Sequence, residues 1–376
     1  MRILITGGAG FIGSNLALRL LEKKYEITVL DSLSQQIHGD KPKKSELYLS
    51  IKDKVRFILG TVTSREDWKK ALQEVDVIVH FAAETGTGQS MYEIEKYVNT
   101  NINGTAIMWD ILANEKHKVK KVVVAASRAI YGEGKYYCKE HKEVYPIERG
   151  IKNLENKDFE VKCPICNRNV DLLGTTEDSK IHPTSVYGLT KSVQEEISLL
   201  IGQSLNIPVV TYRYQNVYGP GQSLKNPYTG ILSIFSTRIK NNNEINIFED
   251  GKESRDFVYI SDVVEATILG IEKEEANYQS FNVGTGVNTS VLAVAETLKK
   301  LYKSEVKIKI SGNFRIGDIR HNFADISKIE KLLGYEPKYS FEKGMEEFVK
   351  WVNKQPIEKD DYENSILEMK EKGLYK

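Results

Sequence analysis

The stretch Ile3-Leu4-Ile5-Thr6-Gly7-Gly8-Ala9-Gly10-Phe11-Ile12-Gly13 decides the fold. It has the pattern of an apolar strand, a tight turn and the start of a helix that continues through Leu21. Glycines at positions 7, 10 and 13 let the turn close, let the backbone approach a pyrophosphate and let the helix pack on the strand. The helix N-terminus would then face the phosphates. The pattern predicts a dinucleotide site at Gly7, Gly10, Phe11, Ile12 and Gly13.

A second predicted strand, Glu26 to Leu30, ends at Asp31. A carboxylate at that position is placed to accept hydrogen bonds from an adenosine ribose, and it would repel a 2′-phosphate, which favours NAD over NADP. The alternative is a glycine turn followed by a solvated aspartate. Further apolar strands alternate with helical segments, which predicts an α/β fold with a doubly wound parallel sheet. These strands are Val55 to Gly60, Val75 to His80 and Lys121 to Ala126.

The composition is ordinary for a soluble protein, because 40% of the 376 residues are hydrophobic and 28% are charged. A chain of this length forms one large or two ordinary domains. The formal net charge of +1 would attract neither nucleic acid nor an anionic membrane, so we expect neither as a partner. No apolar run approaches the ~20 residues that span a bilayer, and no signal peptide is expected before the first strand. Three cysteines suit a reducing compartment, so we expect a cytoplasmic protein.

A Tyr-x-x-x-Lys pair, Tyr187 and Lys191, can make a base from a phenol. On a helix the two side chains share one face, one turn apart. A tyrosine hydroxyl titrates near ~10, and a fixed cation favours the phenolate and lowers that pKa. Ser127, at the end of a buried strand, can supply a hydroxyl to the same substrate oxygen. The three residues therefore predict proton transfer at a substrate hydroxyl.

An insert at 134–176 lies between the two parts of this set and holds every cysteine of the chain. Its two knuckles, Cys138-Lys-Glu-His141 and Cys163-Pro-Ile-Cys166, have the spacing of a closed tetrahedral zinc site. We expect a structural zinc that folds a ribbon too small to have its own core. Reduced cysteines without metal and a redox Cys-x-x-Cys are the alternatives. The polar segment 148–160 is expected to be an exposed loop of the ribbon, and the ribbon is expected to lie near the substrate pocket.

Five motifs occur in order along the chain: Gly7-x-x-Gly10-x-x-Gly13, Asp31, His80-x-Ala82-Ala83, Ser127 four residues before Tyr131-Gly132, and Tyr187-x-x-x-Lys191. Together they resemble the extended short-chain dehydrogenase/reductase family, whose members are mostly nucleotide-sugar epimerases and dehydratases. The resemblance implies a Rossmann-like NAD-binding domain over 1–213, carrying the insert. It implies a smaller, mainly substrate-binding domain over 214–376, from which 256–284 returns to the first domain. It also implies a homodimer.

The resemblance implies roles for individual residues. Ser127, Tyr187 and Lys191 would be the catalytic set. Tyr187 would take a proton from a sugar hydroxyl while the hydride of that carbon moves to NAD, and Lys191 would bind the nicotinamide ribose. Thr61 stands where the family commonly has an aspartate that contacts adenine, so that contact is left open. The other implied cofactor contacts are Ala82 and Ala83.

The resemblance also implies a substrate site in the second half of the chain. Asn216 would contact the diphosphate of a nucleotide sugar. Arg320 and Arg255 would grip the same group, because a guanidinium forks onto phosphate oxygens. Thr85, in the loop after a predicted strand, is the remaining substrate candidate.

Ser127 is followed by Arg128 and Ala129. The family's dehydratases carry an Asp-Glu pair there, which supplies the acid and base for loss of water. Alanine has no such chemistry and a guanidinium stays protonated, so 4,6-dehydration is rejected. A ketone formed at C4 must then be re-reduced, as in epimerisation, or released, as in dehydrogenation. Arg128 is either an anchor for a substrate hydroxyl or carboxylate or an outward salt bridge.

The cysteine-bearing insert narrows the resemblance to one group within this family. Tyr136-x-Cys138-x-x-His141, then Cys163-Pro-x-Cys166, then Pro183-Thr-Ser-Val-Tyr-Gly188 is similar to the group of bacterial dTDP-L-rhamnose 4-epimerases, which make dTDP-6-deoxy-L-talose. We therefore predict an NAD-dependent nucleotide-sugar 4-epimerase that acts through a transient 4-keto sugar. The alternatives are an epimerase for UDP-, GDP- or CDP-sugars, a nucleotide-sugar dehydrogenase or reductase, and a non-catalytic NAD-binding docking protein.

Overall fold

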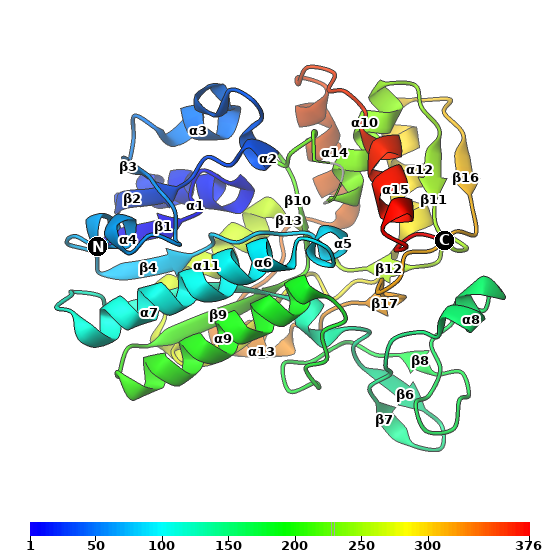
Figure 1. The fold of residues 1–376 in the computed structure, drawn as a ribbon, viewed down its shortest axis with the longest axis horizontal. Helices are drawn as coiled ribbons and strands as arrows, with labels where there is room; N and C mark the ends of the chain where they lie inside the picture. Colours follow the sequence, from blue (N-terminus) through cyan, green and yellow to red (C-terminus); the bar gives the residue numbers. More distant parts are fainter. Residues whose placement is uncertain (227, 229) are drawn as a thin grey trace.

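Seven parallel strands form the main sheet of the molecule (Figure 1). The computed structural model describes residues 1–226, 228 and 230–376. The strands run in the order β14-β9-β5-β4-β1-β2-β3, which confirms the predicted doubly wound α/β fold. Their bounds are β1 Arg2–Thr6, β2 Glu26–Asp31, β3 Arg56–Leu59, β4 Val77–His80, β5 Lys121–Ser127, β9 Val209–Tyr214 and β14 Gln279–Val283.

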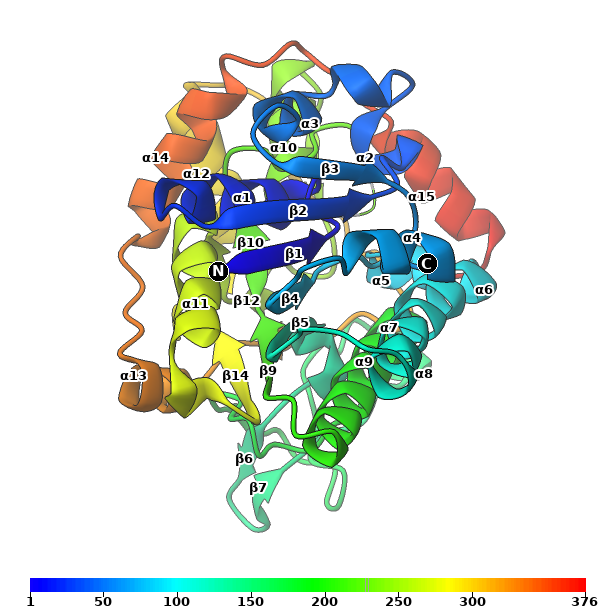
Figure 2. The ribbon, with the colours of Figure 1, turned by 90° about the vertical axis from the view of Figure 1, so that its left-hand side faces the viewer.

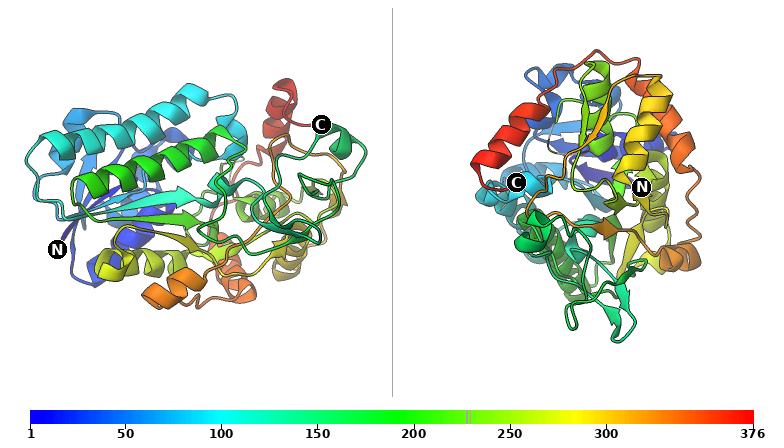
Figure 3. Two further views of the ribbon diagram at one scale, coloured as in Figure 1. Left: turned by 90° about the horizontal axis from the view of Figure 1, so that it is seen from below. Right: turned by 90° about the vertical axis from the view of Figure 1, so that its right-hand side faces the viewer.

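Side chains of the central strands alternate between the two faces of the sheet. On β1, Ile3 and Ile5 pack with α1 and α11, whereas Leu4 packs on the opposite face with α4 and α7. Because helices cover both faces, these strands are nearly continuous apolar runs. Figures 2 and 3 show the two helical layers, with α7 and α9 side by side in one of them. The helices are α1 Phe11–Glu22, α4 Arg65–Ala71, α7 Gly104–Asn114, α9 Val186–Ser204 and α11 Ile260–Glu272.

The segment between β4 and β5 is not one continuous α-helix. Two short helices, α5 (Thr87–Ser90) and α6 (Ile94–Tyr97), lead into a π-helical turn at Val98–Asn103 before α7 begins. The turn holds the buried Asn101 against the backbone of Glu84. The Asn101 Oδ1 accepts from the Glu84 N–H at 2.8 Å, and its amide donates to the Glu84 carbonyl at 3.1 Å. This irregular turn, of a kind frequent at functional sites, fixes the loop that follows β4.

A second, smaller part of the chain follows β9. Its small sheets pair β10 with β13, β11 with β16, and β15-β12-β17. Helix α12 packs between α10 and α14, while α11 and β14 return to the main sheet and α13 packs on β14. The strands are β10 Asn216–Tyr218, β11 Ile245–Ile247, β12 Ser254–Arg255, β13 Phe257–Tyr259, β15 Thr289–Ser290, β16 Ile308–Ile310 and β17 His321–Asn322. The helices are α10 Ile231–Lys240, α12 Val291–Tyr302, α13 Ser327–Leu333, α14 Phe341–Val352 and α15 Tyr362–Glu371.

Short helices complete the connections between these elements. They are α2 Gln35–His38, α3 Glu46–Ile51 and the 3₁₀ turns Pro42–Lys44, Arg128–Tyr131 and Glu274–Ala276. Across 1–226, 228 and 230–376, no helix has both the length and the apolar character needed to cross a bilayer.

The insert folds as a small separate module (Figure 1). Strands β7 (Lys142–Val144), β6 (Tyr136–Cys138) and β8 (Asp171–Leu172) form an antiparallel sheet. The module buries a minimal core in which Tyr136 and Cys163 take part. So small a core needs a cross-link in addition to its apolar contacts.

The segment 148–160 is not the exposed loop that its polarity suggested. It contains a short helix, α8 (Ile151–Glu155), and it docks on the smaller part of the chain. Leu154 and Phe159 are buried there against Phe314. The prediction was wrong because the apolar partner of this segment lies far away in the sequence, where no local pattern shows it.

Buried ion pairs attach the insert to the smaller part of the chain. Arg149, which is 9% exposed, donates from Nη2 to Glu249 Oε1 at 2.8 Å. Glu160 lies 2.7 Å from Arg320 Nη2, and Arg320 also pairs with Glu249 at 2.9 Å and with Asp250 at 2.7 Å. Buried charges are costly without partners. The insert therefore cannot detach without leaving these charges unpaired.

Candidate active site

A cavity of about 410 Å³, here called the first cavity, lies at the carboxyl ends of β1, β2, β4 and β5. Open α/β sheets bind their ligands at this edge. All of the residues that the sequence suggested for the dinucleotide line it: Gly7, Gly10, Phe11, Ile12, Gly13, Asp31, Thr61, Ala82, Ala83, Tyr187 and Lys191.

The glycine turn packs closely against neighbouring backbone at the N-terminus of α1, where it lines the first cavity. A Cβ at Gly13 would lie 2.4 Å from the Gly7 carbonyl oxygen, and one at Gly7 would lie 2.8 Å from the Ala82 nitrogen, so neither position accepts a side chain. The N-cap residue Gly10 makes no side-chain cap, and the first amides of a helix have no intrahelical partner. The turn therefore fits a pyrophosphate, whose oxygens accept from such amides.

Asp31 is held beside the same turn. Its carboxylate accepts hydrogen bonds from the N–H groups of Ala9 at 2.9 Å and Leu33 at 2.8 Å. Thr61 is fixed as well, because its N–H donates to Asp67 Oδ2 at 3.1 Å. This wall of the first cavity can therefore offer a carboxylate and a hydroxyl to a ribose or a base. Further lining residues after β2, which no motif marks in the sequence, are Ser34, Gln36 and His38.

A second cavity, of about 400 Å³, is lined by both parts of the chain. Ser127 and Tyr187 line this cavity and the first one, so the two cavities meet at these residues. The structure also brings to the second cavity four residues that the sequence suggested for the substrate: Thr85, Arg128, Asn216 and Arg255.

Tyr187 lies in the first turn of α9. Ser185 caps that helix, because its hydroxyl accepts a hydrogen bond from the N–H of Gly188 at 3.1 Å. Burial raises the pKa of Tyr187, while a hydrogen bond with Ser127 and the charge of Arg128 lower it. The positive end of the helix dipole also favours a phenolate. Burial is the larger effect and keeps the pKa of Tyr187 above its ordinary value, while Ser127 and Arg128 offset part of that rise.

Lys191 lies one turn further along α9 and is buried. Its Nζ donates to Gln194 Oε1 at 2.7 Å, and the Gln194 amide donates to Thr105 Oγ1 at 2.7 Å. Burial lowers the pKa of Lys191 to about 7. In this structure the charge of Arg128 lowers the pKa of Tyr187. The effect expected of Lys191 on the same hydroxyl stays a prediction.

Arg128 points into the second cavity. Its Nε donates to Asn216 Oδ1 at 3.2 Å, and no carboxylate of the described residues forms a salt bridge with it. Arg128 therefore contacts Asn216 at the cavity and does not form the outward salt bridge that was one of its two expected roles. Burial, and then the charge of Arg255, lower the pKa of Arg128 to about 9, so the guanidinium stays cationic at neutral pH.

Arg320 lies outside both cavities, where the structure does not support the diphosphate contact suggested for it. Its fully buried guanidinium is occupied by carboxylates of the insert and of the loop after β11. Arg315 lines the second cavity instead, with Nη2 2.6 Å from Asp318. Asp318 also lies 3.3 Å from Arg255, so two arginines flank one carboxylate. Arg315 and Arg320 lie in one short stretch of sequence. Glu160, which pairs with Arg320 and not with Arg315, is remote in sequence.

Gln215 is a site residue that the sequence did not suggest. It lines both cavities, it is 4% exposed, and neither its amide nitrogen nor its oxygen has a hydrogen-bond partner among the residues that the structure describes. An unpaired buried amide costs stability unless a ligand satisfies it. Gln215 follows Tyr214, which lies opposite Ser127 in the pairing of β9 with β5. Strand pairing therefore places this amide at the junction of the cavities.

A dinucleotide cleft that shares a serine and a tyrosine with a second, ligand-sized cavity defines an enzyme that transfers a hydride and a proton between a nicotinamide cofactor and a hydroxyl substrate. Residues 3–149 match the NAD dependent epimerase/dehydratase family, and residues 169–348 match the GDP-mannose 4,6 dehydratase family. The chain belongs to the NAD-dependent epimerase/dehydratase family. The match to the GDP-mannose 4,6 dehydratase family begins at residue 169. It therefore does not cover Ser127, Arg128 and Ala129, where the acid-base pair of a dehydratase would lie.

The chain is similar to nucleotide-sugar 4-epimerases over most of its length. It is 35% identical to the dTDP-L-rhamnose 4-epimerase of Burkholderia thailandensis, over 93% of this chain and 94% of that protein. It resembles the UDP-glucose 4-epimerase of Thermotoga maritima solved with UDP-glucose, at a TM-score of 0.74 and 29% identity, over 94% of this chain and 99% of that one. It also resembles the UDP-glucuronic acid 4-epimerase of Bacillus cereus in complex with UDP-glucuronic acid and NAD, at a TM-score of 0.76 and 25% identity, with the same coverage. The protein is an isomerase of the NAD-dependent nucleotide-sugar epimerase family.

Arg128→Met is expected to shift the pH dependence of turnover. With Tyr187 as the expected general base, which acts when deprotonated, turnover should rise with pH through the pKa of this residue. Loss of the nearby cation raises that pKa and should move the rising limb upward by about one pH unit. The measurement is the pH profile of kcat, with Arg128→Lys as the control that keeps the charge. An unchanged midpoint in the Met variant would show that the charge of Arg128 does not act on Tyr187.

Proposed function

We propose that the protein is a nucleotide-sugar 4-epimerase whose substrate is dTDP-L-rhamnose and whose product is dTDP-6-deoxy-L-talose. The junction of the two cavities carries this proposal, because Ser127 and Tyr187 line both cavities while Arg128 and Ala129 stand where dehydration would need an acid and a base. The similarity to the Burkholderia enzyme and the cysteine motifs of the insert support the choice of sugar.

Tyr187 and Ser127, at the junction of the two cavities, have different roles in the reaction at C4 of the sugar. Tyr187 takes the proton of the C4 hydroxyl, and Ser127 holds or relays that proton on the same oxygen. Bound NAD supplies hydride acceptance and return at that carbon. Because the keto carbon can be reduced on either face, the product differs from the substrate only at C4. Lys191 lines the first cavity, where it would bind the nicotinamide ribose.

Incubation with dTDP-L-rhamnose should give the talose epimer without added reductant. Tyr187→Phe lacks the acidic hydroxyl and should lower turnover by about 10²- to 10⁴-fold. Tyr278→Phe removes the same atom from a side chain that is 41% exposed, and should leave turnover unchanged. The measurement is NMR of the product over a panel of dTDP-, UDP-, GDP- and CDP-sugars.

The same assay contains the outcomes that would reject the proposal. Absence of product with every sugar would exclude epimerisation and favour a docking role. NADH that accumulates in step with loss of substrate would identify a dehydrogenase. Full turnover by Tyr187→Phe would remove this residue as the base.

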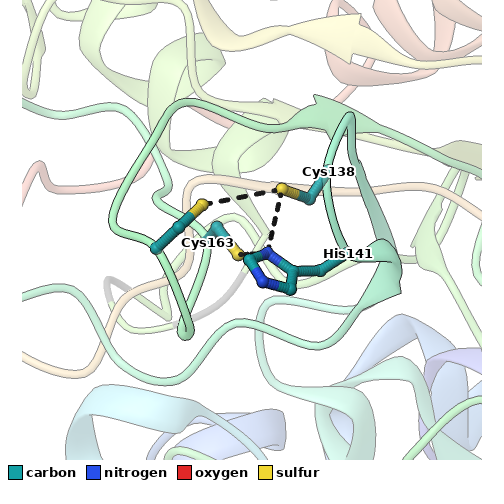
Figure 4. A group of neighbouring side chains, drawn as sticks. Cys138, His141 and Cys163 are labelled. Carbon is teal, nitrogen blue, oxygen red and sulfur yellow. Dashed lines mark hydrogen bonds between the residues drawn. The ribbon is translucent and has the colours of Figure 1, made fainter.

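We also propose that the insert binds one zinc ion. Figure 4 shows Cys138, His141 and Cys163 pointing toward one another. With Cys166 they place four ligand atoms within 4.8 Å of one another. The Sγ atoms of Cys138 and Cys163 each lie 3.6 Å from His141 Nδ1, and the Sγ atoms of Cys138 and Cys166 are 3.8 Å apart. Tetrahedral zinc with bonds of ~2.3 Å to sulfur and ~2.0 Å to nitrogen has S–S edges of about 3.8 Å and S–N edges of about 3.5 Å. The dimensions of the cluster support a closed structural site.

The surroundings of this cluster fit such a role. The backbone N–H of His141 lowers the pKa of Cys138, which favours the thiolate that binds metal. Thiolate ligands persist where cysteines stay reduced, so we place the enzyme in the cytoplasm. Arg149, in the insert, donates to the Asp318 carbonyl at 3.0 Å, and Asp318 lines the second cavity. A folded ribbon therefore supports the wall of that cavity.

Loss of the metal should weaken both the ribbon and the second cavity. Metal analysis of purified protein should find about one zinc per chain. Cys163→Ser should lose the metal, lower the thermal unfolding midpoint by several degrees and weaken the binding of dTDP. Ile165→Ser, in the same knuckle but 67% exposed, is the control that should keep the metal. Metal-free protein with unchanged stability and dTDP affinity would contradict the structural role.

We further propose a homodimer formed through the layer of α6, the π turn and α9. Ile94 and Val98 lie one turn apart on one helical segment and are 52% and 40% exposed. Leu189 and Leu200 lie three turns apart on α9, and they are 51% and 67% exposed. Helices α6 and α9 pack together, so both pairs belong to one layer. Exposed apolar surface of this kind marks protein interfaces.

Light scattering should give twice the mass of one chain. Leu200→Glu places a charge in the proposed interface and should yield monomers. Ile357→Glu changes a side chain that is 62% exposed elsewhere, and should leave the dimer intact. A monomeric wild-type protein at micromolar concentration would contradict the proposal.

A further inference from the structure

Contacts along the second cavity establish an order from one end to the other. At the junction, Arg128 lies close enough to Arg255 for their charges to interact. Arg255 and Arg315 flank Asp318, at 3.3 Å and 2.6 Å. The Arg315 guanidinium then lies over the ring of Phe248, 5.3 Å from its centroid. The cavity therefore runs from the catalytic tyrosine past two arginines to an aromatic end.

A nucleotide sugar has its parts in the same order. With the reacting sugar carbon at Tyr187, the diphosphate falls at the two arginines, which bind phosphate oxygens. The nucleobase then falls at the aromatic end. This placement rests on the proposed function.

Helix α15 covers the aromatic end of the cavity (Figure 1, red). It belongs to residues 355–376, here called the tail segment. Its residues Tyr362, Ile366 and Met369 line the second cavity and are at most 7% exposed. They form one apolar cluster in which Phe248 takes part. A base at this end of the cavity would therefore contact the tail segment.

The tail segment also holds the strand that carries one of the two arginines. The backbone of 374–376 pairs with that of 314–316 through N–H···O distances of 2.9 to 3.1 Å. Arg315 is the central residue of this pairing, opposite Tyr375. The tail segment therefore positions a phosphate-facing arginine as well as the wall next to it.

Contacts with α10 and with Tyr228 anchor α15 in this position. Arg238 of α10 lies 3.4 Å from Asp360, and its guanidinium stacks 4.4 Å from the centroid of the Tyr362 ring. On the next turns of α15, Glu368 accepts a hydrogen bond from the hydroxyl of Tyr228. The helix is therefore attached from two sides.

Two polar side chains at the aromatic end have unused hydrogen-bonding capacity. The amide of Asn246 donates to the Tyr362 hydroxyl at 3.3 Å, but its Oδ1 has no partner within the described part of the chain. Glu253, which is 7% exposed, has one carboxylate oxygen that no described residue contacts by a hydrogen bond. Both line the second cavity. The edge of a nucleobase offers the donors and acceptors that would satisfy them.

We propose that the tail segment forms the nucleobase end of the second cavity and selects which nucleotide the enzyme accepts. Ile366 and Met369 form the wall against the base. Tyr362 is a positioning residue, because its hydroxyl orients the amide of Asn246 toward the base.

Full-length variants with NAD bound test this proposal by calorimetric titration with dTDP, UDP, GDP and ADP. Ile366→Ala should weaken the preferred nucleotide roughly tenfold, because it opens a gap beside the base. Tyr362→Phe keeps the ring but loses the hydroxyl, and should reduce the preference between bases about three- to tenfold. Leu367→Ala, one residue along α15 but 56% exposed, is the matched control and should behave as wild type.

The outcomes separate a selective role from a merely structural one. Unchanged ratios of Kd among the four nucleotides in both variants overturn the proposal, even if every Kd rises together. Retention of NAD shows that the fold is intact, since among the described residues none of the tail segment lines the first cavity. Failure of epimerisation by a wild type that binds nucleoside diphosphates contradicts the proposed function alone.

Discussion

The parallel pairing of β5 with β4 and β9 is the constraint on which the site depends. Ser127 ends β5 opposite Tyr214, and the glycine turn follows β1 at the same edge of the sheet. All parallel strands of this sheet have their carboxyl ends at one edge. This edge therefore brings together the glycine turn, Ser127 and the start of the smaller part of the chain. A slip of one residue in β5 would turn Ser127 toward the opposite face of the sheet. The register of buried, apolar strands thus determines where the hydroxyl chemistry can occur.

Buried charges then join the insert to the smaller part of the chain. Arg149 and Arg320 are buried among the carboxylates of Glu249, Asp250 and Glu160, and these residues come from both the insert and the smaller part of the chain. Breaking the Arg149–Glu249 pair, which is buried on both sides, would cost about 3–5 kcal/mol, because it leaves an uncompensated charge in a region that excludes water. The ion pairs contribute little net stability compared with apolar packing, but they permit only one way of docking the insert. The docked insert thereby fixes the position of the wall of the second cavity around Asp318.

Local patterns in the sequence predicted those features that neighbouring residues determine. The glycine turn, the alternating strands, the spacing of Tyr187 from Lys191 and the two cysteine knuckles all belong to this class. The carboxylates that surround Arg320, while Arg315 stays on the second cavity, are remote in sequence, so the motif alone could not separate the two arginines. Likewise, 148–160 is polar but buries apolar side chains against a distant loop. No sequence pattern marks the unpaired amide of Gln215, because its position between the two cavities depends on the folded structure.

The position of the insert also affects the order in which the molecule folds. Ser127 precedes 134–176 and Tyr187 follows it, so the two approach each other only when a long loop closes. The entropy of closing a loop grows with its length, and non-local contacts of this kind slow folding. A ribbon that closes first around its own knuckles shortens the flexible part of that loop. With the zinc that we propose for the insert, the thiols of a newly synthesised chain would meet metal before Tyr187 meets Ser127. Metal supply during synthesis would then set the yield of competent enzyme rather than the speed of each catalytic cycle.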